Sequence, residues 1–553
     1  MKIICTLFLA LLCPCLTNAA EVIYADDVNN KVPVVFNNLS DLAQDFNLDI
    51  DTTNFKLQKK TESLLGTHYY FKQVVDNYDV DNAVIIVSVD KDGNVSQIYN
   101  NANPNVNNQK VNRIPFITQE KALELAWNHL KVNGELLDNP IVKLLVSSKS
   151  NLVYKVTIGV SSPFGYWDLT IDAQTGDILS VTDAFFPRMK SPGTYGHRDE
   201  NRPLTSFNEA LEDIQNKNKD NFNLINSFDL SFVSGTALVF DPNPSVTLKR
   251  SDLEDSTAAS VFLPAYMAEE LKEITFSNSI YSLKGPKVTL IDFESPKIAP
   301  STSRTASWTA TRGNNSFTDA MTYVHLDRSL RYLETLGYAG SKALFKKSLE
   351  VDANGVNGED NSHYIPSSDR LAFGHGCVDD NEDTDVILHE LGHAIETHIG
   401  SWSGGDTGAM GEGFGDYWAS SYSVSRPNGL EVHPEWVYKW DGHNKCWPGR
   451  RMDAFTPKYN PSRTYEAHAK VDGGNADELW STPIFQAFLE LYKRGVPREV
   501  MDQIMIEAHF GLGYGTKIPQ MATNIVKTAK KLFPENDYDQ VYLKHFKNQG
   551  ILK

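Results

Sequence analysis

Two histidines four residues apart, His389 and His393, lie in the segment HELGH, and Glu390 stands directly beside the first of them. On an α-helix, residues four apart share one face, so both imidazoles can bind the same metal ion. A glutamate at this position can act as the general base of a metal-dependent hydrolase. A catalytic zinc ion also needs a third protein ligand and one open position for water. The spacing therefore predicts a zinc centre that activates water.

Glu412, in the segment GEGFGDYW, is the natural third ligand. Eighteen residues separate it from His393, enough for one helix to end, a glycine-rich loop to turn and a second helix to begin. Asp416 lies one helical turn later, where its carboxylate can accept the second ring N–H of a ligand histidine and fix the tautomer. We therefore predict that Glu412 completes a zinc site with the two histidines and that Asp416 supports it.

The segments HELGH and GEGFGDYW together resemble the zinc site of thermolysin-like metalloproteases. The wording GAMGEGFGD is similar to that of their fungalysin-like relatives. Two upstream segments, SGTALVFDPNP at residues 234–244 and SFTDAMTYVHLDRSLRYLETLG at residues 316–337, resemble the N-terminal part of mature fungalysin-like enzymes. The resemblance implies a secreted zinc metalloendopeptidase that hydrolyses peptide bonds in protein or peptide substrates, with Glu390 as general base.

The same resemblance implies the α+β class and a two-lobed, thermolysin-like catalytic part. Its mixed α/β N-terminal lobe is expected at residues 188–385, and its zinc helix and mainly α-helical C-terminal lobe at residues 386–553. A zinc aminopeptidase is one alternative that the 18-residue spacing also suits, but no GxMEN-type motif of that family stands between Ser316 and His389. The other alternative is a non-enzymatic secreted module that retains the fold.

Residues 1–19 have the pattern of a secretory signal peptide, with a lysine, an apolar run at residues 3–16 and small residues up to Ala19. The run is too short for a mature membrane anchor. Cys13 would suit lipoprotein processing, but Leu12 precedes it where a small residue is expected. No other apolar run approaches membrane length. We therefore expect a secreted, extracellular protein without a membrane anchor.

Cysteine usage and net charge give further information on the kind of protein and its partners. Five cysteines reduce to two, Cys377 and Cys446, once the signal peptide is removed. An even pair in an exported chain predicts one disulfide bond. The formal net charge is −18, from 70 acidic and 52 basic residues without a basic cluster. Phosphate-binding surfaces are basic, so the charge argues against a nucleic-acid partner.

An Asn-rich linker at residues 100–109 separates two small α+β regions ahead of the zinc motif, one at residues 20–105 and one at residues 110–187. They resemble the paired prosegment of thermolysin-like zymogens, the second region being similar to a PepSY domain. An ordinary α+β adhesion module is the alternative. The resemblance implies that the enzyme's own prosegment is its partner, a folding assistant and temporary inhibitor removed by self-cleavage within the loose stretch at residues 186–202.

The pattern of apolar residues predicts the main elements. In the second prosegment module it predicts a helix at residues 119–131 and strands at residues 141–147, 152–160 and 166–172. In the catalytic part it predicts an amphipathic helix at residues 318–335, with one apolar face formed by Met321, Val324, Leu330 and Leu333. Helices of the last lobe are expected at residues 477–494, 497–510 and 520–532.

Two segments before the zinc helix allow two interpretations each. Residues 361–374 (NSHYIPSSDRLAFG) resemble the edge strand that binds substrate backbone in the family, and a plain edge strand is the alternative. An acidic run could hold calcium, which prefers oxygen ligands, or could serve the positive end of the helix dipole. We favour the dipole interpretation, because other acidic ligands of thermolysin-like calcium sites are not recognisable. The run consists of Asp379, Asp380, Glu382, Asp383 and Asp385.

The chain departs from the thermolysin-like pattern at the oxyanion donors. The family places a histidine before a helix and a tyrosine after the zinc helix, but here residues 471–483 contain no histidine and residues 398–410 no tyrosine. His468 is the nearest imidazole, and Arg450 in GRRMD resembles the family's cleft arginine. An active enzyme needs a replacement donor, since losing one costs about 10² to 10³ in rate. We expect His468 or Arg450 to donate; a solvated loop histidine is the alternative for His468.

Overall fold

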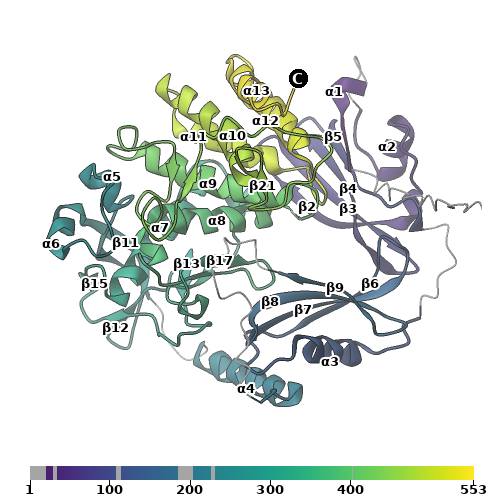
Figure 1. The fold of residues 1–553 in the computed structure, drawn as a ribbon. Coiled ribbons are helices and arrows are strands. Elements are labelled where there is room, and N and C mark those ends of the chain that lie inside the picture. Colours follow the sequence, from purple (N-terminus) through teal and green to yellow (C-terminus); the bar gives the residue numbers. More distant parts are fainter. Residues whose placement is uncertain (1–19, 29–33, 107–113, 185–202, 226–230, 401–402) are drawn as a thin grey trace, which may run out of the picture.

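The computed structural model describes residues 20–28, 34–106, 114–184, 203–225, 231–400 and 403–553 (Figure 1). These residues form a mixed α and β protein, with an N-terminal region built on one sheet and a larger C-terminal region in which helices predominate. The α+β class predicted from the sequence is confirmed. The predicted signal peptide at residues 1–19 and the predicted cleavage stretch at residues 186–202 lie outside the described residues.

Within the described residues, nine strands of the N-terminal region form one sheet in the order β1-β5-β4-β6-β7-β8-β9, with β3 also pairing β4 and β2 pairing β3. The strands are β1 (Glu21–Tyr24), β2 (Phe55–Glu62), β3 (Gly66–Val75), β4 (Tyr78–Asp90), β5 (Val95–Asn100), β6 (Ile141–Val146), β7 (Leu152–Ser161), β8 (Phe164–Asp172) and β9 (Ile178–Asp183). The helices that accompany them are α1 (Ala25–Val28), α2 (Leu39–Asp45), α3 (Gln119–Leu130) and α4 (Phe207–Ile225).

This sheet carries two hydrophobic cores. One contains Leu42 and Ile98, on the β1–β5 side. The other contains Trp127 of α3 and lies under β6 to β9. The sheet is continuous between them because Val80 of β4 pairs in parallel with Val146 of β6. The two prosegment modules expected from the sequence therefore have separate cores but share one sheet.

The C-terminal region holds two larger sheets, ordered β14-β12-β11-β10-β15 and β13-β16-β18-β17, and two short hairpins. Its strands are β10 (Ser231–Val239), β11 (Met267–Ser277), β12 (Ile280–Ser282), β13 (Val288–Leu290), β14 (Thr302–Ser303), β15 (Ser307–Trp308), β16 (Leu349–Asp352), β17 (Ser362–Ile365), β18 (Arg370–Phe373), β19 (Trp436–Val437), β20 (Arg450–Arg451), β21 (Lys470–Val471) and β22 (Gly474–Asn475). Its helices are α5 (Pro244–Leu248), α6 (Ala259–Phe262), α7 (Asn315–Thr335), α8 (Thr384–Ile399), α9 (Thr407–Ser425), α10 (Ala476–Lys493), α11 (Arg498–His509), α12 (Ile518–Leu532) and α13 (Tyr538–Asn548).

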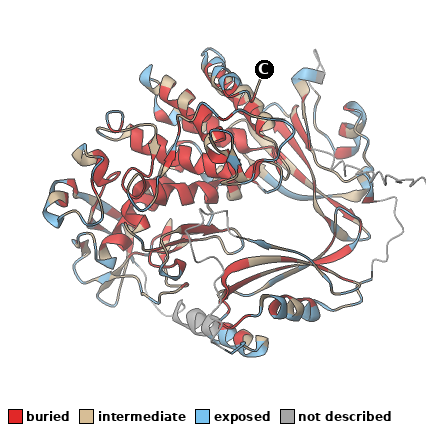
Figure 2. Ribbon diagram, in the orientation of Figure 1, coloured by how far each residue is buried: buried red, intermediate tan, exposed pale blue. Residues whose placement is uncertain are grey.

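Helix α7 is more deeply buried than the amphipathic helix predicted at residues 318–335. Every residue from Phe317 to Asp327 is buried, because α7 packs on strands of both sheets and on α8 (Figure 2). Polar side chains on its circumference therefore need protein partners. Asp319 accepts from the backbone N–H of Ser301, and His325 bonds through Nε2 to the carbonyl of Phe240. The apolar pattern identifies one face correctly, but the tertiary structure covers all faces of the helix between Phe317 and Asp327.

The single edge strand predicted at residues 361–374 is also wrong in detail. The segment is a hairpin in which β17 is the edge and β18 lies inside the sheet, between β17 and β16. The reversal follows from the Pro-Ser-Ser-Asp turn, in which the N–H of Asp369 donates to the carbonyl of Ile365 and Asp369 takes a positive φ of 56°. β17 packs against α8, so the strand nearest the zinc motif is β17.

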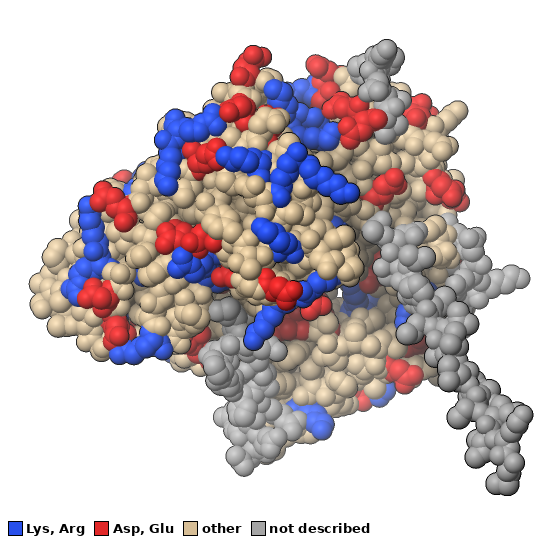
Figure 3. Space-filling model, turned by 45° about the horizontal axis from the view of Figure 1, so that its top comes forward, with Lys and Arg blue, Asp and Glu red and all other residues tan. Residues whose placement is uncertain are grey.

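The surface mixes charges of both signs. On the face shown in Figure 3, acidic and basic side chains are interspersed. Some form exposed ion pairs such as Arg494 with Asp537, at 2.6 Å. Pairs of this kind contribute little stability, because water screens them. Of the helices that the structure describes, none has both the length and the apolar character needed to cross a membrane.

Candidate metal centre

Two glycines allow α8 and α9 to approach closely enough for their side chains to meet. A Cβ added at Gly392 would lie 2.8 Å from the Cα of Gly415, and one added at Gly415 would lie 2.6 Å from Nδ1 of His389. Both distances are shorter than real Cβ contacts. The close packing that brings Glu412 of α9 to the histidines of α8 therefore requires glycine at both positions.

The three predicted ligands point their donor atoms at one another. The Nε2 atoms of His389 and His393 are 3.1 Å apart. One carboxylate oxygen of Glu412 lies 3.5 Å from the first Nε2, and the other lies 3.4 Å from the second. Zinc binds nitrogen and oxygen at about 2.0–2.1 Å, so ligand atoms of a tetrahedral site stand about 3.3 Å apart. The donor set and its spacing therefore fit a zinc ion with an open fourth position.

Asp416 is placed as the sequence predicts, behind the first ligand. Its Oδ1 is 3.1 Å from Nδ1 of His389, which leaves Nε2 for the metal side. Burial alone would lower the pKa of His389, but hydrogen bonds to Asp416 and Glu412 outweigh it and raise that pKa to about 9. The two carboxylates hold the imidazole in place. A bound cation would replace that proton, since a ligand histidine must be deprotonated on the metal side.

Arg450 lies inside the site rather than at its rim. It is 3% exposed, and its two terminal nitrogens lie 2.6 Å from Glu412 and 2.8 Å from Asp416. Burial would raise the pKa of the Glu412 carboxyl, but the charges of His468 and Arg450, with hydrogen bonds from both ligand histidines, hold it well below its usual range. Glu412 is therefore kept ionised, as a metal ligand must be.

His468 is not a solvated loop histidine. Its Nδ1 is 2.7 Å from Oδ2 of Asp477, its backbone N–H donates to the other oxygen of the same carboxylate, and its Nε2 is 3.7 Å from Glu412. Burial would lower the pKa of His468, but the charge of Glu412 and the bond to Asp477 raise it to about 9. The structure thus brings His468 to the zinc motif and orients it through Asp477.

The two candidate oxyanion donors differ in how much of their hydrogen-bonding capacity is already used. Both terminal nitrogens of Arg450 are engaged by the carboxylates of Glu412, Asp416 and, at 3.4 Å, Asp477. Removal of Arg450 would leave these buried carboxylates without a counter-charge, so we expect it to destabilise the site. Arg450 therefore holds these carboxylates, and the choice between His468 and Arg450 as oxyanion donor stays a prediction.

Sequence reasoning missed two residues of the site. Asp477 lies in the first turn of α10, where an acidic residue is typical of a helix N-terminus, so the sequence alone predicts no further role for it. Tyr438 donates its hydroxyl to Asp416 at 3.0 Å and is in contact with Arg450. The sequence does carry a signal for the pairing of His468 with Asp477, because an acidic residue follows the histidine after nine residues. Nothing in the sequence indicates that Tyr438 belongs to the site, because it comes from a separate loop outside the zinc motif.

The acidic run before α8 is used mainly by protein groups. Asp383 caps α8 by accepting from the backbone N–H of Asp385, at 3.0 Å. Glu382 pairs with Arg312 at 2.9 Å, and Asp385 lies 3.6 Å from Nζ of Lys439. These contacts support the helix-terminus interpretation of the run.

Asp380, in the same run, accepts from the hydroxyl of Ser362 and also has carboxylate neighbours. Its carboxylate groups with those of Asp360 and Asp441, with one oxygen of each within 4.8 Å of the others. Burial and the charges of neighbouring carboxylates, Asp441 first among them, raise the pKa of Asp380 well above its usual range. Calcium binding to the run stays a prediction.

The predicted disulfide between Cys377 and Cys446 is confirmed, with a Cα–Cα distance of 6.3 Å. It joins the segment between β18 and α8 to the loop between β19 and β20. The first segment leads into the zinc helix and the second leads into Arg450. The bond therefore links two chain segments that position residues of the site.

Comparison with known proteins identifies one segment of the chain. Residues 53–102, which hold β2 to β5, match the fungalysin/thermolysin propeptide motif. The predicted prosegment resemblance is confirmed to that extent. The similarity of the second module to PepSY domains stays a prediction.

Curated relatives match over a limited length. The bacillolysins of Bacillus subtilis (strain 168) and Bacillus amyloliquefaciens are 30% identical over 139 residues and 28% identical over 134 residues. Each match covers 22% of this chain and 26% of the relative, so the chain spans about a quarter of the length of these relatives. Among solved structures, the precursor of protealysin, a metalloproteinase from Serratia proteamaculans, is 16% identical and covers 47% of this chain and 84% of its own, with a TM-score of 0.36.

Proposed function

We propose that the chain is the zymogen of a secreted, thermolysin-like zinc endopeptidase. The observation that carries the proposal is the triangle of His389, His393 and Glu412, whose donor atoms have the spacing of a tetrahedral zinc site. The fungalysin/thermolysin propeptide motif at residues 53–102 supports the zymogen part. An endopeptidase of this kind acts on proteins or peptides, so these are the proposed substrates. Secretion is proposed because of the predicted signal peptide.

The residues of the site divide the work of peptide hydrolysis among them. When bound, zinc supplies Lewis acidity, which polarises the scissile carbonyl and makes water a nucleophile near neutral pH. Glu390, next to the first ligand on α8 and 7% exposed, takes the proton of the attacking water and delivers it to the leaving amine. Glu390 is not counted among the ligands, since its carboxylate must reach the water. Asp416 fixes the tautomer of His389.

Stabilisation of the oxyanion falls to His468. Asp477 holds its Nδ1, and the surrounding carboxylates favour the protonated ring, in which both nitrogens are donors. Its Nε2 lies 3.7 Å from a carboxylate oxygen of Glu412, so the ring N–H stands beside the proposed zinc ligands, where the oxyanion of a bound substrate would form. Arg450 keeps Glu412 and Asp416 in position by charge-assisted hydrogen bonds.

The test combines metal analysis with an activity assay. The purified chain is expected to contain one zinc ion and to hydrolyse a protein substrate, and a chelator should abolish hydrolysis. Glu390→Gln should abolish hydrolysis and keep the zinc. His398→Gln is the matched control on the same helix. His398 lies in the last turn of α8, where its Nε2 forms a hydrogen bond with Asp369, so it should not be needed for zinc binding. Folded protein without zinc would contradict the proposal, and zinc-loaded protein inert on all peptides would favour the non-enzymatic alternative.

The Glu390→Gln chain also tests self-processing. If the enzyme removes its own prosegment, this chain should stay at full length after export while the unsubstituted chain is shortened. Trimming of the Glu390→Gln chain to the same size, when it is produced alone, would show that another protease does the cutting.

A further inference from the structure

Residues 203–216 follow the stretch in which composition predicts the end of the prosegment, yet they pack on the prosegment. Phe207, Ala210, Leu211 and Ile214 of α4 lie on one helical face, at intervals of three and four residues. All four belong to the hydrophobic cluster around Trp127 of α3. Among the described residues of α4, none is part of the cluster that forms the core of the C-terminal region.

Specific contacts fix the position of α4 on α3. The indole N–H of Trp127 donates to the carbonyl of Thr205 at 2.8 Å, and the N–H of Thr205 donates to the carbonyl of Val132 at 2.9 Å. The rings of Trp127 and Phe207 meet edge to face, with centroids 5.3 Å apart. Ala210 is 3% exposed and Ile214 8% exposed. Burial and directional hydrogen bonds together indicate a built interface.

Helix α4 packs on the prosegment but follows the predicted cleavage stretch in the chain. Figure 1 shows α4 beside α3, on the side of the molecule away from α8 to α13. In sequence, α4 comes after residues 185–202 and directly before the strand β10 of the C-terminal region. A cut within residues 185–202 therefore leaves α4 covalently attached to the catalytic part while its apolar face remains docked on the prosegment.

We infer that α4 is a clamp that holds the prosegment on the catalytic part after the chain between them is cut. The clamp's partner is this chain's own second prosegment module, at residues 114–184. A single cut at residues 185–202 is then not enough for release; α4 must undock or be removed by a second cut before β10. The inference rests on the proposed zymogen organisation, but its test uses an inactive chain and needs no hydrolysis.

Other contacts also join the two parts, among them the ion pair of Arg370 with Asp138, at 2.9 Å. The contribution of α4 to holding the two parts together must therefore be measured by comparing a cut before α4 with a cut after it. Two Glu390→Gln chains each carry an inserted recognition sequence for a site-specific protease, one within residues 185–202 and one within residues 226–230. After cutting, the rate at which the prosegment leaves a catalytic part immobilised by its C-terminus is recorded.

The clamp predicts slower release from the first chain. There α4 stays with the catalytic part and adds its contacts to the joint, whereas in the second chain α4 leaves with the prosegment. Added contacts act mainly on dissociation rates, so we expect release from the first chain to be about tenfold slower or more. Equal rates, or faster release from the first chain, would overturn the inference.

Substitutions within α4 give an independent reading in the first chain. Ile214→Asp places a charge in the buried face and should raise the release rate towards that of the second chain. Glu212→Ala, at an exposed position of the same helix, is the matched control and should change nothing. Phe207→Ala is a milder variant in case Ile214→Asp disturbs folding, which the melting of the uncut chains reports. Release at the unsubstituted rate from folded Ile214→Asp and Phe207→Ala chains would refute the clamp.

Discussion

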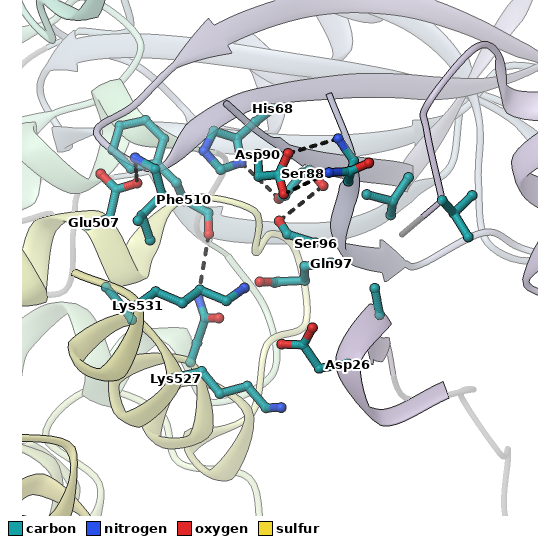
Figure 4. A pocket seen from close by; sticks show the side chains of 17 residues that line it. Asp26, His68, Ser88, Asp90, Ser96, Gln97, Glu507, Phe510, Lys527 and Lys531 are labelled. Carbon is teal, nitrogen blue, oxygen red and sulfur yellow. Dashed lines mark hydrogen bonds between the residues drawn. The ribbon is translucent and has the colours of Figure 1, made fainter. Parts of the chain in front are cut away.

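Glu507 of α11 is the residue whose replacement should most weaken the joint between prosegment and catalytic part. Its carboxylate accepts hydrogen bonds from the Ser63 hydroxyl at 2.6 Å and from the backbone N–H groups of Leu64 and Leu65, each at 2.9 Å. Glu507 is 3% exposed, and burial raises the pKa of its carboxyl. Figure 4 shows it at the junction, at a cavity of about 600 Å³ lined from both parts. The perturbation is Glu507→Gln.

The expected magnitude follows from these contacts. Glutamine keeps one oxygen, but its NH₂ group replaces the other and faces a prosegment donor instead of accepting from it. A hydrogen bond to a charged group contributes about 1.5–3 kcal/mol, and a buried donor left without an acceptor costs about 1–3 kcal/mol. A net loss of about 3 kcal/mol corresponds to an affinity of the prosegment about 100-fold weaker. The effect should appear in binding, because Leu64 and Leu65 belong to the prosegment.

The assay measures the Kd of the isolated prosegment for the catalytic part in the Glu390→Gln background, with both parts taken from a chain cut at an inserted protease site. Glu499→Gln is the matched control, since Glu499 is an exposed glutamate on the same helix. The reasoning fails if Glu507→Gln binds the prosegment as tightly as the Glu499→Gln control. A loss of binding with an unchanged melting temperature of the catalytic part would support it.

Three further predictions concern the catalytic part. Replacing Cys377 and Cys446 by serine should lower the free energy of unfolding by about 4 kcal/mol in denaturant titrations, since the bond closes a large loop; an unchanged midpoint would contradict this. His468→Ala should lower kcat by about 10² to 10³ at unchanged zinc content, as for a lost oxyanion donor, and a wild-type kcat would exclude that role. Burial lowers the pKa of His325 to about 4. The unfolded chain therefore binds more protons between the unfolded pKa of about 6.5 and pH 4, and stability should fall by up to about 3 kcal/mol as the pH drops through that window. His325→Gln should flatten this dependence, which unfolding at pH 7 and pH 4.5 would reveal.

The zinc motif could be predicted because its geometry is local. Two histidines four residues apart meet on any helix, and Glu412 with Asp416 repeats the same spacing on the next helix. The disulfide could be predicted because only two cysteines remain once the predicted signal peptide is set aside. The helices α10 to α12 were also found within about two residues of their bounds, since each keeps a regular apolar face.

Only the tertiary structure could decide contacts between segments far apart in the chain. Ser63 meets Glu507 across 444 residues, and no pattern at either end announces the other. Helix α7 has an apolar stripe, but the burial of every residue from Phe317 to Asp327 results from the elements that surround it. Helix α4 follows the predicted cleavage stretch at residues 186–202, so its position in the sequence assigns it to the catalytic part. In the structure its apolar face packs in the cluster around Trp127. Periodicity along a chain states that a face must be buried; which surface buries it depends on how the whole chain packs.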